Sequence, residues 1–109
     1  MQLLFNTIVL GRIAFWIKYL FYTLPTDSNE NRLHLHIFRG KGRHILSLSK
    51  IWIEQNGNKS ISVAYNNGIP AKDLKIILQL IDENWTELVK QIEDSFEGKN
   101  TRIIELKIK

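Results

Sequence analysis

Two histidines separated by one residue are the feature of this sequence with the clearest chemical potential. His34 and His36 lie in an alternating segment, Leu33-His34-Leu35-His36-Ile37-Phe38. Such alternation is typical of a β-strand with one apolar face. Side chains two residues apart on a strand project from the same face, about 6.5–7 Å from each other. We therefore expect the two imidazoles to lie side by side.

One chemistry that suits such a pair is acid–base catalysis on a phosphodiester, because histidine titrates near neutral pH. One imidazole would abstract the proton of a 2′-hydroxyl, and the other would protonate the leaving oxygen. Arg39, Lys41 and Arg43 would stabilise the developing charge, and Phe38 would stack on a base. A metal-independent ribonuclease with the two histidines as its catalytic residues is one hypothesis.

Two other interpretations of the histidines stay open. The spacing also suits the two-histidine arm of a site for zinc or another metal that prefers imidazole. A third ligand would then come from His44, Asp27 or Glu30. The plainer alternative is that both rings are solvated on the polar face of the strand or hydrogen-bonded to a neighbouring strand. The sequence contains no nucleotide-binding fingerprint, Ser/His/Asp array or EF-hand spacing. We expect no cofactor and assign no metal ligands.

The histidines belong to the densest basic stretch of the chain, residues 32–50, which contains no acidic residue. Such a stretch attracts phosphate-bearing partners, RNA among them. The candidate residues for phosphate or nucleic-acid binding are Arg32, Phe38, Arg39, Lys41, Arg43 and His44. The formal net charge of +4 is modest, so solubilising surface cations are the alternative.

Length and composition define the class of protein. The 109 residues are expected to form a single domain, 1–109. The hydrophobic fraction of 44% and the charged fraction of 24% exclude wholesale disorder. The chain has no cysteine, which excludes a disulfide scaffold, a thiolate zinc site and a cysteine nucleophile. This composition fits a cytoplasmic location.

Residues 3–24 are unusually apolar. Asn6, Arg12 and Lys18 interrupt the stretch, so it does not predict a membrane span, and the uncharged start does not predict a secretory signal. We expect two buried strands at 3–10 and 12–23, turning near Gly11, and no membrane partner. Because a small domain that exposes such a surface aggregates unless it is paired, we expect a homo-oligomer or a complex with a cognate small protein.

The rest of the chain predicts an α+β fold. Strands are expected at 33–38, at 44–54 with a bulge near Ser49-Lys50, at 60–65, and at 101–108 near the C-terminus. Residues 70–97 carry apolar side chains at helical spacing over six turns, with a kink or a break at 82–84. Trp52 and Trp85 are interpreted as core anchors. The prediction is a mostly antiparallel sheet of about five or six strands packed on one long or kinked helix, with a C-terminal strand.

Four segments together resemble a known family. They are His34-Leu35-His36-Ile37, Ser49-Lys50-Ile51-Trp52-Ile53-Glu54, Ala64-Tyr65-Asn66-Asn67-Gly68-Ile69-Pro70 and Asp73-Leu74-Lys75-Ile76-Ile77. In this order they resemble a family of small bacterial proteins catalogued as domain of unknown function number four thousand one hundred and sixty, over about residues 11–97. The resemblance implies a small bacterial cytoplasmic protein, often encoded beside another short protein in a toxin–antitoxin-like arrangement. It brings no established activity.

The chain departs from the family pattern in three places. Arg32-Leu33 stands where the family usually has two prolines, residues 43–48 resemble an insertion, and the tail 99–109 extends past the usual helical end. The leading hypothesis is a component of a toxin–antitoxin-like pair that acts through protein contacts and RNA contacts. The ribonuclease and a small metal-binding protein are the alternatives.

Overall fold

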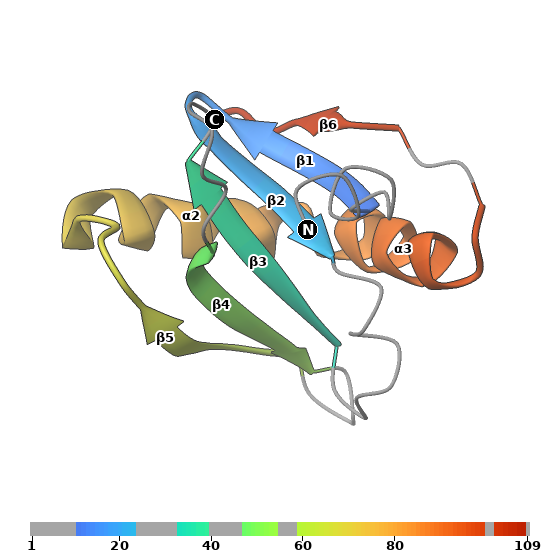
Figure 1. Cartoon of the computed structure of the whole chain (residues 1–109), viewed down its shortest axis with the longest axis horizontal. Coiled ribbons are helices and arrows are strands. Elements are labelled where there is room, and N and C mark those ends of the chain that lie inside the picture. Colours follow the sequence, from blue (N-terminus) through green and yellow to red (C-terminus); the bar gives the residue numbers. More distant parts are fainter. Residues whose placement is uncertain (1–10, 24–32, 40–46, 55–58, 100–101, 109) are drawn as a thin grey trace, which may run out of the picture.

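The computed structural model describes residues 11–23, 33–39, 47–54, 59–99 and 102–108. Their strands form one sheet in the spatial order β5-β4-β3-β2-β1-β6 (Figure 1). The elements are β1 (Gly11–Trp16), β2 (Tyr19–Thr23), β3 (Leu33–Arg39), β4 (Ser47–Glu54), β5 (Ser60–Asn66), α2 (Ala71–Glu83), α3 (Trp85–Phe96) and β6 (Ile104–Glu105). Strands β1 to β5 pair antiparallel in chain order, and β6 joins β1 in parallel. The predicted α+β fold is confirmed.

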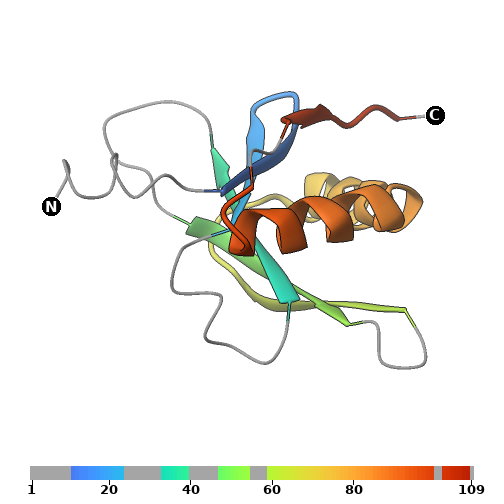
Figure 2. The ribbon, with the colours of Figure 1, turned by 90° about the vertical axis from the view of Figure 1, so that its right-hand side faces the viewer.

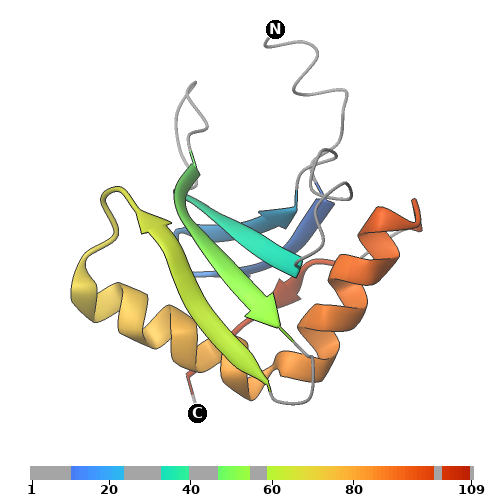
Figure 3. The same ribbon diagram turned by 90° about the horizontal axis from the view of Figure 1, so that it is seen from below.

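Both helices lie on the same side of the sheet (Figures 2 and 3). Helix α3 packs beside β1, whereas α2 lies toward β5 (Figure 3). The core fills the space between the two layers, because each amphipathic helix buries its apolar stripe against the apolar face of the strands. Its fully buried members include Phe21, Leu35, Ile37, Ile51 and Ile53 from the sheet and Ile77, Leu80, Ile81, Leu88 and Ile92 from the helices. Among the described residues, no helix combines the length and the apolarity that a membrane crossing needs.

The helical segment 70–97 is broken at Asn84, as one of the two sequence-based alternatives predicted. The backbone of Asn84 leaves the helical region at φ −115° and ψ 28°. Its side-chain Nδ2 donates a hydrogen bond to the carbonyl oxygen of Leu80 over 2.8 Å. Asparagine competes with the helix in this way because its side chain can bond the nearby backbone. The break lets α2 and α3 follow different parts of the twisted sheet.

The prediction of one strand over 12–23 is wrong. This stretch forms the hairpin β1–β2, with Ile17 and Lys18 at its tip. Ile17 adopts φ 46°, a left-handed conformation that a β-branched residue rarely takes, so no turn signal marked the position. Strand β2 lies inside the sheet, and β6 pairs with the outer side of β1. Residues 11–23 therefore do not form an open edge of the described sheet; residues 3–10 lie outside the described part of the chain.

Two register irregularities set which way neighbouring side chains face. In the β3–β4 pair, Ile37 is opposite Ser49 and Phe38 is opposite Ser47, so the predicted bulge falls at Leu48, next to the expected position. In the β4–β5 pair, Val63 is opposite Ile51 and Tyr65 is opposite Lys50. Val63 and Tyr65 therefore lie on opposite faces, although they are two residues apart in the strand. At the C-terminus, the expected strand 101–108 is reduced to β6 at the sheet edge.

Candidate functional site

The two histidines lie on the sheet face that the helices leave uncovered. Alternation along β3 sends Leu35 and Ile37 into the core, and the intervening His34 and His36 to the other face. Across the strands, His34 pairs with Trp52 of β4, while His36 lies between Tyr22 of β2 and Lys50 of β4. The resulting line of rings, Tyr22, His34, His36, Phe38 and Trp52, is called the histidine–aromatic row below.

The rings of this row contact one another. The centroids of His34 and His36 are 5.1 Å apart with an interplanar angle of 76°, which confirms the predicted side-by-side placement. Trp52 meets His34 edge-on at 5.1 Å, and Tyr22 stacks on Phe38 at 5.1 Å. The Lys50 ammonium lies 4.4 Å from the Trp52 ring centroid, within the range of a cation–π contact. The row is a packed assembly rather than a set of separate side chains.

Burial decides what the histidines can do in this conformation. The exposed fractions of His34, His36 and Phe38 are 0%, 7% and 2%, so the two histidine rings are not solvated. The other part of that interpretation, hydrogen bonding to a neighbouring strand, stays a prediction. Two adjacent imidazoles would suit an acid–base pair, but a catalytic group must come within hydrogen-bond reach of its substrate. A polymeric phosphodiester cannot approach rings that are buried to this degree. Catalysis by this pair would require the row to open.

The other predicted binding residues do not gather around the histidines in the described structure. Arg39 pairs with Tyr19 at the end of β3, which places it on the helix-covered side of the sheet, away from Phe38. Arg32, Lys41, Arg43 and His44 lie outside the described residues, as do the possible third metal ligands Asp27 and Glu30. Within the described ranges, no group of three or more His, Cys, Asp or Glu residues is arranged to hold a metal.

A hydrogen bond between buried Tyr19 and partly exposed Asp73 joins the sheet to α2, and sequence analysis did not predict it. The Tyr19 hydroxyl donates a hydrogen bond of 2.6 Å to the Asp73 carboxylate in the first turn of α2. Burial is the main cause that raises the pKa of Tyr19 to about 12, and the hydrogen bond and charge of Asp73 add to it, while the charge of Arg39 opposes the shift. Because Tyr19 keeps its proton at neutral pH, the pair is a tether and not a base.

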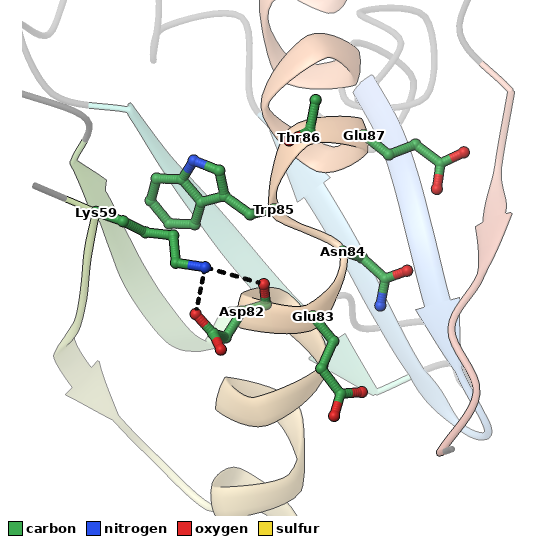
Figure 4. Close-up of a pocket in the computed structure, with 7 residues that line it drawn as sticks. All are labelled: Lys59, Asp82, Glu83, Asn84, Trp85, Thr86 and Glu87. Carbon is green, nitrogen blue, oxygen red and sulfur yellow. Dashed lines mark hydrogen bonds and ion pairs between the residues drawn. The ribbon is translucent and has the colours of Figure 1, made fainter.

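A cavity of about 410 Å³ lies at the junction of α2 and α3 (Figure 4). Asp82, Glu83 and Glu87 make it acidic. The Lys59 ammonium, from the start of β5, enters it and forms a 2.7 Å ion pair with Asp82. The same ammonium lies 5.5 Å from the Trp85 ring centroid. Lys59 thereby fastens the beginning of β5 to the junction of the helices, so a structural role accounts for these contacts.

The feature of the fold most suited to binding another protein is the outer edge of β5. Among the described strands, β5 is the last in the sheet on this side, and its seven residues, Ser60 to Asn66, include no charged side chain. All of them are exposed except Ile61, which is half-buried. At the other end of the sheet, β6 has two residues, one of which is Glu105. Sequence analysis identified β5 as a strand but not as an edge, because strand order depends on pairings that local sequence does not encode.

Comparison with known proteins identifies one family. The sequence model described as Domain of unknown function (DUF4160) matches residues 17–93, which is more than two-thirds of the 109-residue chain. The match includes the histidine–aromatic row, β5, α2 and most of α3. No curated protein and no solved structure gives a significant match.

Proposed function

The chain belongs to the DUF4160 family, and from that premise we propose that it is one component of a toxin–antitoxin-like pair of small bacterial proteins, acting through protein contact rather than catalysis. The observation that carries this proposal is the open, uncharged edge of β5. An edge strand presents backbone N–H and C=O groups that can pair with another chain. Strand addition at such an edge is a common mode of protein recognition.

The burial of the histidines supports contact over catalysis. His34 and His36 contribute to a packed row in which His34 is also in contact with Trp52. Rings held in this way help to fix the registers of β2, β3 and β4, because cross-strand aromatic pairs stabilise a sheet. The row thereby stabilises β4, the strand with which β5 pairs.

The proposal expects a short protein to be encoded beside this chain, and it is tested by co-expression of the two. We expect the two proteins to purify as one complex, and Val63→Lys to weaken that complex. Val63 is 38% exposed on β5, and a lysine there puts a charge on the pairing edge, as natural edge strands do to prevent pairing. Ile108→Lys is the matched control, because Ile108 is 58% exposed and lies beyond β6 at the opposite end of the sheet.

Failure of the two proteins to associate would remove this proposal. A different result would favour the ribonuclease alternative: the purified wild-type chain cleaves RNA near neutral pH, and His36→Gln abolishes the cleavage while the circular dichroism spectrum is unchanged. Zinc that purifies in stoichiometric amounts with the chain, and is lost on His34→Ala, would instead favour the metal-binding alternative.

A further inference from the structure

Strand β5 differs from the opposite edge of the sheet in the ways that decide whether an edge pairs. Natural proteins protect edges by keeping them short or by placing charges on them. β6 is short and contains Glu105, with Lys107 two residues further on. β5 has seven residues and no charge. Val63 and Tyr65 on β5 are large apolar side chains, exposed to 38% and 37%.

We propose that the strand that pairs with β5 belongs to a second copy of this chain, in an antiparallel register centred on Ser62. This inference rests on the proposed contact role of β5 and names the occupant of the edge in the chain alone, which the neighbouring protein would have to displace in order to pair there. The two sheets would become one continuous sheet, with both pairs of helices on the same side. The pairing is two-fold symmetric, as most homodimers are.

The directions of the β5 side chains select this register. Ile61 and Val63 pair with Ile53 and Ile51 of β4, so both face the helix side. Directly opposed residues of an antiparallel pair share a face. A two-fold axis at Ser62 therefore places Ile61 of each copy against Val63 of the other and forms two apolar pairs. An axis at Val63 would instead oppose Ile61 to Tyr65, which the register shift has turned to the other face.

Charge complementarity on α2 favours a second copy over an unrelated strand. Exposed Lys72 and Lys75 lie in the first half of α2, and exposed Asp82 and Glu83 lie in its last turn. Asp82 is fastened to Lys59 at the start of β5, so the acidic end of α2 lies beside the start of β5 (Figures 3 and 4). In the antiparallel dimer, the basic half of each α2 lies at the same end of the interface as the acidic turn of the other. The symmetric arrangement thus places opposite charges at each end of the interface.

A charge-swap experiment tests both the occupant and the register. Ser62→Lys and Ser62→Glu each place like charges directly opposite each other at the two-fold axis, whereas an equimolar mixture of the two variants places opposite charges there. By sedimentation velocity, we expect the wild-type chain to shift from monomer to dimer as its concentration rises to about 100 µM. Each variant alone is expected to be monomeric, and the mixture to dimerise at least about tenfold more tightly than either. Ile108→Lys and Ile108→Glu, at the far end of the sheet, are the matched controls and should remain dimeric.

Two results would overturn the inference: a wild-type chain that stays monomeric throughout this range, or Ser62 variants that dimerise as well as the wild type. Hydrogen exchange of the wild-type chain gives a second readout that needs no substitution. Protection of the amides of residues 60–66 should rise with protein concentration, and protection that is independent of concentration contradicts the pairing.

The same samples separate this inference from the proposed function. A chain that is monomeric alone and forms a one-to-one complex with the neighbouring protein would exclude the second copy and leave the contact function intact. A dimer that depends on Ser62 but does not bind the neighbouring protein would support the second copy and remove the toxin–antitoxin-like role.

Discussion

Removing the Tyr19 hydroxyl should change both the stability of the protein and its response to alkali. Tyr19 is fully buried, and its hydroxyl donates a 2.6 Å hydrogen bond to Asp73. In Tyr19→Phe that bond is lost, while the partly exposed Asp73 carboxylate can still be hydrated. Hydrogen bonds to charged groups contribute about 1.5–3 kcal/mol. With partial rehydration of Asp73, we expect the free energy of unfolding at pH 7 to fall by about 1–2 kcal/mol.

The order of stability should reverse in alkali. The pKa of Tyr19 is raised from its ordinary value of 10.0 to about 12 in the folded protein, so the folded protein keeps this proton up to about pH 12. The unfolded chain releases that proton near pH 10. The stability linked to the proton is therefore complete below pH 10 and is lost as the pH rises through 12. Two pH units correspond to about 2.7 kcal/mol, which exceeds the cost of the substitution, so the variant should become the more stable protein above about pH 11.

Urea titrations followed by circular dichroism between pH 7 and pH 12.5 would measure this crossing. The difference between wild type and Tyr19→Phe isolates the contribution of Tyr19, because the lysines and the other tyrosines titrate in both proteins. Tyr22→Phe is the control for the loss of a tyrosine hydroxyl from the neighbouring part of the same strand. If the free energies of unfolding of wild type and Tyr19→Phe run parallel across this pH range, the argument that burial and Asp73 hold the proton is wrong.

Three backbone and turn positions give further predictions, each measured as a free energy of unfolding in urea. Ile17→Asn should stabilise the protein by about 1 kcal/mol, because Ile17 has φ 46° and asparagine tolerates this region better; Ile17→Val, which keeps the β-branch, should give no gain. Gly68→Ala should cost about 1–3 kcal/mol, since φ is +121° and only glycine adopts it easily. Gly98→Ala, at φ +77° in open space, should cost less. Asn66→Ala should cost about 1–3 kcal/mol because its side chain bonds the amide and the carbonyl of Ile69, and Asn66→Asp, which keeps the acceptor, should cost less.

The sequence predicted the features that depend on local periodicity. Alternation at residues 33–38 correctly predicted β3 and the adjacent rings of His34 and His36. Helical spacing predicted the segment that forms α2 and α3, and Asn84 lies in the predicted kink region. These predictions succeed because a strand and a helix each impose a fixed period on the side chains that must be buried.

The features that sequence analysis missed arise from non-local pairing. The Tyr19–Asp73 bond joins residues 54 positions apart, and it forms because the first turn of α2 lies near the start of β2. The turn at Ile17 has no glycine or asparagine, since the pairing of β1 with β2 imposes its conformation. Trp52 was expected in the core but is half-buried beside His34. Its face follows from the bulge at Leu48, which local alternation could place only approximately.

The two most unusual parts of the sheet are neighbours in the fold. Trp52 pairs with His34 on one side and with Ser62 on the other, so β4 links the histidine–aromatic row to the open edge. Packing these rings costs side-chain conformational entropy. The cross-strand contacts that they form offset this cost and stabilise β4, the strand with which β5 pairs. An uncharged edge of seven residues invites uncontrolled pairing unless a specific strand covers it. A rigid support behind an unprotected edge is the arrangement expected of a binding strand, because a preorganised edge loses little entropy when its partner docks.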